Sequence, residues 1–263
     1  MFWTPLHAYT LIPQFVFYIA LAFILSRLLK NKDYETQLLP LKICTVILLL
    51  LEAAKQITGI VTGYDTYWIP LHFCSLFLYF HPLACFYKGK HRDRLILIAG
   101  VVSMCLFLFM AVYPNVIYSD EAVRSMWRFV TGRGGSFFEL HTVLFHGIGL
   151  FTFFLFVFQG LAKFNTRKDV KLLIVTYGAY CLIAGPIAQI IDTNFNNFVH
   201  SNAPFLENIR LAVIESAGPV LGQTVYVLII SAGTILVPLI AYFVLKALTG
   251  VFNKRKAAAP GES

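Results

Sequence analysis

Long apolar stretches separated by short polar segments run along the whole chain. A helix needs about 20 apolar residues to cross the hydrocarbon core of a bilayer. Seven stretches approach this length, at 12–29, 41–62, 67–87, 94–113, 137–160, 171–192 and 222–248. Nowhere does a competing strand-like alternation of apolar and polar residues occur. The pattern predicts an all-α, polytopic membrane protein with seven transmembrane helices.

Composition supports this class. Of the 263 residues, 58% are hydrophobic and 13% are charged, and the mean hydropathy is +0.73. Soluble domains carry roughly 25% charged residues. The five cysteines lie inside apolar stretches, without metal-ligand spacing or a secreted disulfide pattern, and are interpreted as small core residues. The first apolar stretch lacks a basic leader and a small-residue cleavage site, so we interpret it as a retained span rather than a signal peptide.

The distribution of lysine and arginine predicts the orientation. Sixteen of these residues flank one set of loop positions: Arg27, Lys30, Lys32 and Lys42; Lys88, Lys90, Arg92 and Arg94; Lys163, Arg167, Lys168 and Lys171; and Lys246, Lys254, Arg255 and Lys256. The opposite side has four, Arg124, Arg128, Arg133 and Arg210, all in long loops. Positive charge concentrates on the cytoplasmic side of membrane proteins. The N-terminus is therefore predicted outside and the C-terminus in the cytoplasm of a multi-pass cell-membrane protein.

This placement also explains the formal net charge of +8 without a nucleic-acid partner. We expect a seven-helix domain over 1–252 and a disordered cytoplasmic tail over 253–263. The two long outer loops, about 114–136 and 193–221, could each hold a short interfacial helix, at Asp120–Val130 and Pro204–Ala217. These loops are equally compatible with functional lids and with packed covers.

Ionisable groups inside membrane spans are costly and are usually paired or functional. The second stretch carries Glu52, Lys55 and Gln56. Glu52 and Lys55 are three residues apart, so they share a helix face and can neutralise each other. A structural ion pair is one interpretation, and a role in orienting a catalytic or ligand-contacting group is the other.

Further polar residues fall near the predicted outer ends of three other spans. The third stretch contributes His72, Cys74 and Ser75, and the fifth contributes Glu139, Thr142 and His146. Glu139 and His146 are seven residues apart and so face one direction. The sixth stretch ends with Asp192, Asn194 and Asn197 at the outer face. Because four spans deliver such groups to one depth, whereas the inner half has little besides His81, we expect a polar pocket open to the outer leaflet.

These same residues carry a resemblance to a known family. The segments PLHFC at Pro70–Cys74, ELHTVLFHG at Glu139–Gly147 and TNFNN at Thr193–Asn197 resemble the YwaF-like bacterial integral membrane family, which is akin to the eukaryotic transmembrane protein 164 group. The resemblance follows the order of these motifs over most of the chain. The eukaryotic branch is described as lipid acyltransferases that use a cysteine with a histidine.

The resemblance implies that His146 corresponds to the histidine of that pair. The cysteine of the family lies directly between the proline and the histidine of the third span, and Leu71 occupies that position here. Cys74 is two residues beyond His72 and is a different position. The resemblance therefore supports the architecture more strongly than the reaction.

We expect a lipid-handling enzyme, of acyltransferase or hydrolase type, with membrane lipids as partners and a lipid or small molecule as ligand. The candidate catalytic residues are His72, Cys74, Glu139, His146 and Asp192, and the candidate substrate-binding residues are Glu52, Lys55, Gln56, Ser75, Thr142, Asn194 and Asn197. His72 or His146 would act as base, and Cys74, Ser75, Thr142 or water as nucleophile. No cofactor and no metal are expected, and the sequence leaves the oligomeric state open.

Other functions fit parts of the pattern. A zinc hydrolase of the alkaline-ceramidase or PAQR type uses two histidines four residues apart, whereas His141 and His146 are five apart. Haem binding by His72 and His146 is a further alternative. A transporter or ligand-binding protein without catalysis would use the intramembrane charges as a solute or proton path, and a structural or assembly role needs no site at all.

Overall fold

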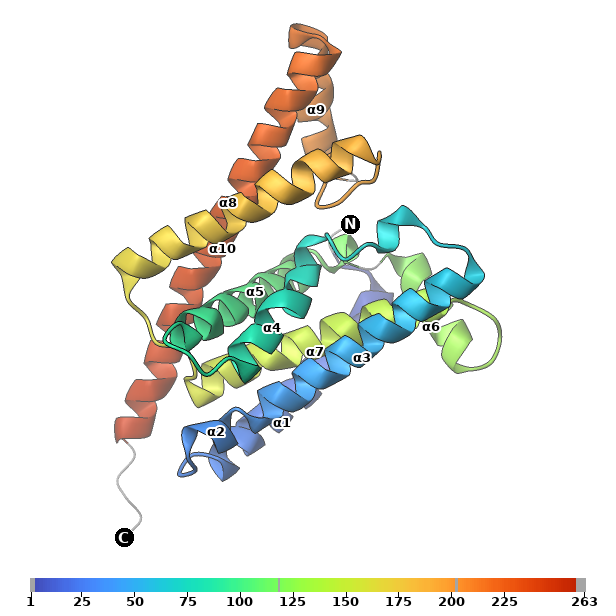
Figure 1. The fold of residues 1–263 in the computed structure, drawn as a ribbon. Helices are drawn as coiled ribbons and strands as arrows, with labels where there is room; N and C mark the ends of the chain where they lie inside the picture. The colour runs from blue at the N-terminus through green and yellow to red at the C-terminus, as the bar shows by residue number, and fades with distance from the viewer. Residues whose placement is uncertain (1–2, 118, 202, 259–263) are drawn as a thin grey trace. The chain divides into compact units, whose positions relative to one another are not determined.

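The computed structural model describes residues 3–117, 119–201 and 203–258, and within them every regular element is helical (Figure 1). The α-helices are α1 (Pro5–Leu28), α2 (Tyr34–Gln37), α3 (Leu39–Thr62), α4 (Leu76–Phe86), α5 (Arg92–Val112), α6 (Asp120–Val130), α7 (Phe137–Gln159), α8 (Thr166–Ile190), α9 (Pro204–Ala217) and α10 (Pro219–Ala258). Short 3-10 turns lie at Thr66–Trp68, Phe73–Ser75 and Pro114–Val116.

Six helices, α1, α3, α5, α7, α8 and α10, are long and apolar enough to cross a membrane. They correspond to six of the seven predicted apolar stretches. Their sequences explain why they are helical: each is predominantly apolar over about 20 positions, and helix formation satisfies the backbone hydrogen bonds within the segment. The all-α class and the membrane character predicted from the sequence are confirmed.

The prediction of one continuous helix over 67–87 is wrong. The chain leaves α3 at Thr62, passes through an extended segment around Ile69 and His72, and forms a regular helix only from Leu76. Pro70 explains the interruption, because proline has no N–H and its ring disfavours the helical conformation of the residue before it. The apolar helix that follows, Phe73–Phe86 with its initial 3-10 turn, is shorter than the other six.

The chain divides into two compact units, each described here by itself. Unit 1 comprises Met1–Thr58, Phe77–Phe164 and Ala241–Ser263, and unit 2 comprises Gly59–Leu76 and Asn165–Ile240. Unit 1 therefore contains α1, α2, nearly all of α3 and of α4, all of α5, α6 and α7, and the last part of α10. Unit 2 contains α8, α9 and the first part of α10.

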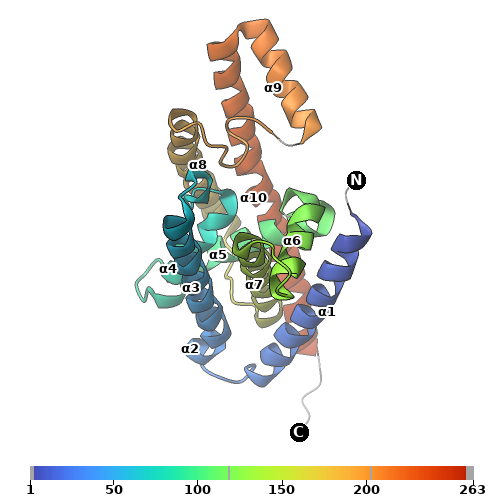
Figure 2. The same cartoon turned by 90° about the vertical axis from the view of Figure 1, so that its right-hand side faces the viewer.

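Helix α7 forms the centre of unit 1, where it packs against α1, α5 and α6 (Figures 1 and 2). Its residues from Gly149 to Val157 are buried without exception. Phe107 of α5 stacks on Phe153 of α7, with ring centroids 4.2 Å apart. Gly160 ends the helix in the left-handed conformation, with φ of 69°, which glycine adopts without steric cost.

In unit 2, the segment after α8 is a folded loop rather than an open connection. Phe195 and Phe198 are fully buried. The side chains of Gln189 and Gln223 both donate hydrogen bonds to the Phe198 carbonyl, at 2.8 and 3.1 Å. These contacts connect the end of α8 to the start of α10 through the loop.

The two helices predicted in the long loops are present with the predicted bounds, as α6 and α9. Ser119 caps α6 by accepting a hydrogen bond from the Ala122 N–H. Helix α10 extends to Ala258, into the segment predicted as a disordered tail, and residues 259–263 of that prediction lie outside the described residues.

Candidate functional site

Glu52 is the centre of a charged group in the interior of unit 1. Its Oε1 atom accepts a hydrogen bond from Gln56 Nε2 at 2.6 Å and forms an ion pair with Lys55 Nζ at 2.8 Å. Its Oε2 atom lies 3.6 Å from His141 Nε2 of α7. Glu52 and His141 are buried, and Lys55 and Gln56 are half-buried.

The predicted Glu52–Lys55 pair is therefore confirmed, and the structure adds His141 as a partner on a second helix. An ionised carboxylate inside an apolar helix is costly unless opposite charges and hydrogen bonds compensate it. Lys55 supplies the charge, Gln56 supplies a hydrogen bond, and His141 supplies a second cation when it is protonated. These contacts compensate the Glu52 carboxylate and link α3 to α7.

His146 lies one turn and a half further along α7, buried, with its Nδ1 atom 2.7 Å from the backbone carbonyl of Thr142. A carbonyl oxygen can only accept, so Nδ1 carries the proton. In the neutral ring, Nε2 is then the basic nitrogen. A buried imidazole whose tautomer is determined by the backbone is suited to act as a general base.

The two neighbours predicted with His146 occupy the first turns of the same helix. Glu139 lies in the first turn of α7, half-buried. The Thr142 hydroxyl donates to the Phe138 carbonyl at 2.9 Å, so its proton is already engaged in the helix backbone. Thr142 thus contributes its carbonyl to His146, and its side chain is not positioned as an activated nucleophile.

His72 belongs to unit 2, where it occupies the extended segment before the Phe73–Ser75 turn. Its Nε2 atom lies 2.9 Å from the Tyr67 carbonyl, so Nε2 donates and Nδ1 is the basic nitrogen. The ring lies edge-on to Tyr67 at 4.3 Å and to Phe195 at 5.1 Å between centroids. Aromatic rings therefore hold this second histidine in one orientation.

The residues next to His72 show what replaces the cysteine that the resemblance implied. The Leu71 carbonyl accepts a hydrogen bond from the Tyr180 hydroxyl at 2.8 Å, so this backbone position is anchored to α8. Cys74 is half-buried and free of any disulfide, and Ser75 is buried. The leucine side chain provides no nucleophile at the family position.

The polar residues after α8 build the loop. Asn194 Oδ1 accepts hydrogen bonds from the N–H groups of Val199 and His200, at 3.2 and 3.3 Å. Asn197 Oδ1 accepts from the Ser201 hydroxyl at 3.3 Å. Asp192 and Asn197 adopt left-handed conformations, with φ of 48° and 62°, which Asp and Asn tolerate better than most residues. Asp192 is exposed.

The predicted site residues therefore fall into two groups. Unit 1 holds Glu52, Lys55, Gln56, Glu139, Thr142 and His146, and unit 2 holds His72, Cys74, Ser75, Asp192, Asn194 and Asn197. Within unit 1, the structure brings Glu52, Lys55 and Gln56 into direct contact. Within unit 2, Asn194 and Asn197 form hydrogen bonds to residues of their own loop, and His72 contacts the Tyr67 carbonyl.

Two polar groups were missed by sequence reasoning. His141 was dismissed because of its spacing to His146, whereas its partner is on another helix. The second group is fully buried: His81 Nε2 lies 3.3 Å from Ser103 Oγ, which lies 2.9 Å from Thr152 Oγ1. The three side chains come from three different helices, so only the packing of α4, α5 and α7 reveals the contact.

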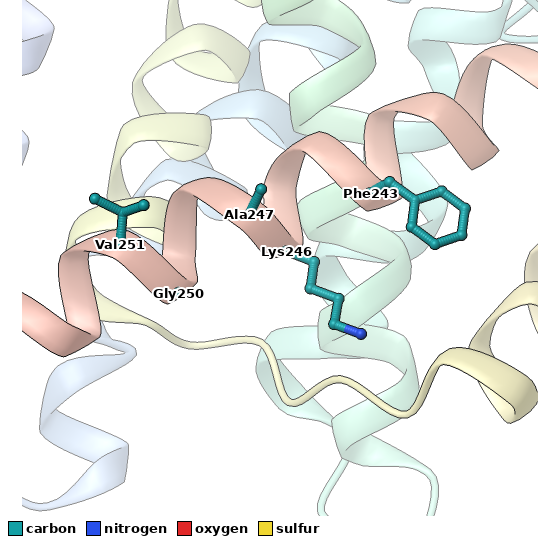
Figure 3. Close-up of a pocket in the computed structure, with 5 residues that line it drawn as sticks. All are labelled: Phe243, Lys246, Ala247, Gly250 and Val251. Carbon is teal, nitrogen blue, oxygen red and sulfur yellow. The ribbon is translucent and has the colours of Figure 1, made fainter.

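The described part of the chain contains no group of three or more His, Cys, Asp or Glu side chains that could hold a metal ion. A surface pocket is present on α10, lined by Phe243, Lys246, Ala247, Gly250 and Val251 (Figure 3). All five residues lie on the one helix, and none belongs to the predicted site. This pocket is therefore separate from the charged group around Glu52.

Six apolar helices of membrane-spanning length, with ionised residues paired inside them, define a polytopic helical membrane protein. The sequence profile of the TMEM164 family matches residues 2–244, which is nearly the whole chain. This protein belongs to the TMEM164 family. Comparison with curated proteins gives no match, and comparison with solved structures gives none either.

Proposed function

We propose that this protein is a lipid-handling membrane enzyme of the acyltransferase or hydrolase type, with His146 as its general base. The observation that carries the proposal is the 2.7 Å contact between His146 Nδ1 and the Thr142 carbonyl. This contact leaves Nε2 as the basic nitrogen of a buried ring within an apolar helix. A base at such a position can act on substrates that are dissolved in the bilayer.

The proposed reaction depends on the absence of a thiol nucleophile at Leu71. Since no cysteine occupies the family position, we propose direct transfer to an acceptor hydroxyl or to water, without an acyl-enzyme at that position. His146 Nε2 takes the proton as the hydroxyl oxygen attacks the ester carbonyl of a lipid. The bond from the carbonyl carbon to the leaving alcohol oxygen then breaks, and that alcohol receives the proton from Nε2–H.

The proposal includes seven crossings of the cell membrane, with the N-terminus outside and the polar pocket in the outer half of the bilayer. The helix Phe73–Phe86 would make the third crossing. At 1.5 Å per residue it spans about 20 Å, and the extended segment before it adds about 10 Å. Together these lengths approach the hydrocarbon thickness of about 30 Å. Reporter fusions to the C-terminus would test the orientation, and an extracellular C-terminus would contradict it.

The test of the enzyme is turnover of a phospholipid with a labelled acyl chain by the purified protein in vesicles. We expect release or transfer of the label by the wild type, loss of at least about 100-fold in His146→Gln, and little change in Thr142→Val. The last variant keeps the backbone carbonyl that orients the ring, so it is a matched control. Turnover in His146→Gln at the wild-type rate would contradict the assignment. Loss of turnover in Cys74→Ser would contradict direct transfer.

A transporter or ligand-binding protein without catalysis is the second candidate. The buried Glu52–Lys55–His141 group favours it, because intramembrane charges often mark solute or proton paths. In that case a Glu52→Gln variant would abolish ligand uptake or binding, while no lipid turnover would be seen with any variant.

A further inference from the structure

Helix α1 carries a stripe of polar residues, none of which is a candidate site residue or has a role in the proposed function. His7, Thr10, Gln14 and Tyr18 are spaced by three or four residues, so they lie on one face of the helix. The other faces expose large apolar side chains, among them Ile12, Val16 and Phe17. The helix packs closely against α7.

Two atoms of this stripe are buried without a hydrogen-bond partner. Thr10 is 5% exposed, and its Oγ1 atom has no partner among the described residues. The same holds for the Oε1 atom of Gln14, one turn further along. A buried polar group without a partner costs free energy comparable to a lost hydrogen bond, and in a hydrocarbon environment no solvent compensates it. Both atoms are therefore suited to bond to a molecule that donates hydrogen bonds.

The backbone of α7 approaches this stripe closely at Gly147, because the position has no Cβ atom. A Cβ atom placed on Gly147 would lie 2.8 Å from Tyr18 Oη and 3.3 Å from Gln14 Oε1. The glycine thus lets a hydroxyl and a carbonyl oxygen from α1 approach the backbone of α7. Tyr18 Oη can donate or accept, and Gln14 Oε1 can only accept.

We propose that the stripe Thr10–Gln14–Tyr18, together with Gly147, binds a hydroxyl group, which either a lipid or water could present. A hydroxyl can donate to Gln14 Oε1 and exchange a second hydrogen bond with Tyr18 Oη. Gln14 and Tyr18 are half-buried, so they reach the apolar surface of α1, where a lipid would arrive. The proposed function assigns no role to α1. The experiments for this site measure ligand binding and thermal stability, so their outcome is independent of lipid turnover.

The first experiment compares two probes on the purified wild-type protein in detergent. One is a lysophosphatidylcholine with a free hydroxyl on the central glycerol carbon, and the other is its methyl ether at that carbon. We expect the free hydroxyl to bind about tenfold more tightly, the ratio that one buried hydrogen bond provides. The preference should vanish in Gln14→Leu and in Gly147→Ala, and remain in Gly178→Ala, where an added Cβ meets nothing within 4 Å.

The second experiment identifies water as the source of the hydroxyl. If water occupies the stripe, wild type shows no preference between the probes, and Thr10→Val and Gln14→Leu each lower the melting temperature because bonded water is lost. If both variants melt at or above the wild-type temperature and the probes bind equally, the stripe binds no hydroxyl and the proposal is overturned.

Discussion

Glu52 of α3 and His141 of α7 face each other in the interior of unit 1, with Oε2 and Nε2 3.6 Å apart. They are separated by almost ninety positions in the chain. The contact links a local ion pair to the central helix of the unit. Several consequences of this and related contacts can be measured.

Replacing Lys55 by Met should destabilise the protein. The variant leaves the buried Glu52 carboxylate with Gln56 and His141 but without its nearest cation. Breaking a buried ion pair by removing one partner costs about 3 kcal/mol. Thermal unfolding in detergent would measure the loss. The double variant with Glu52→Leu and Lys55→Leu should recover most of it, and a double variant as unstable as Lys55→Met would show that the pair itself is stabilising.

Replacing Gly149 by Ala should disturb the core of unit 1. An added Cβ would lie 2.5 Å from Leu106 Cδ2 and 2.8 Å from Phe77 Cζ, so both side chains would have to move. Overpacking of this kind costs about 1–3 kcal/mol. The matched variant Gly178→Ala, in the middle of α8, meets no atom within 4 Å and should be neutral or stabilising. Equal melting temperatures for the two variants would contradict the tight packing of α5 and α7.

The ion pairs of Glu35 in unit 1 predict that stability decreases at acid pH. Hydrogen bonds from Arg92 and Lys42 lower the pKa of Glu35 from 4.5 to about 2. Because the folded-state pKa is below the unfolded value, the carboxylate contributes stability above pH 4.5 that is lost as the pH falls from 4.5 towards 2. In Glu35→Gln this part of the pH dependence should disappear from unfolding curves. The control Glu215→Gln, at an exposed position of α9, should retain it.

Replacing Asn194 by Ala should loosen the loop after α8. Its Oδ1 atom accepts from the N–H groups of Val199 and His200, and both would lose this acceptor. The expected cost is about 1–2 kcal/mol, measured as a lower melting temperature of the purified protein. Asn208→Ala, at an exposed position of α9, is the control and should change little. An unchanged melting temperature in Asn194→Ala together with lost ligand binding would favour the substrate-binding role predicted from the sequence.

The segment around Pro70 and the polar stripe of α1 depart from the sequence prediction for two different reasons. The apolar length of 67–87 predicts one helix, because membrane helices can tolerate a proline such as Pro70. Pro82 is tolerated within α4, and so is Pro186 within α8, whereas Pro70 lies where the chain is extended. Hydrophobicity alone does not distinguish these cases, because the tolerance of a proline depends on what satisfies the neighbouring backbone groups.

The polar stripe on α1 is absent from the predicted site for a different reason. The spacing of His7, Thr10, Gln14 and Tyr18 was visible in the sequence as a helical repeat. Thr10 and Gln14 carry no charge, so the cost of an ionised group inside a span does not single them out as site candidates. Its significance appears only with Gly147 on the facing helix.

The sequence by itself determined features that are each contained within a single helix. These are the six long apolar helices, the two loop helices and the Glu52–Lys55 pair. These depend on length and on a repeat of 3.6 residues, which are local properties of the chain. Only the tertiary structure decided that His141 meets Glu52 and that Gly147 meets the stripe of α1. Such contacts depend on which faces of two helices pack together, and the spacing within either helix does not contain that information.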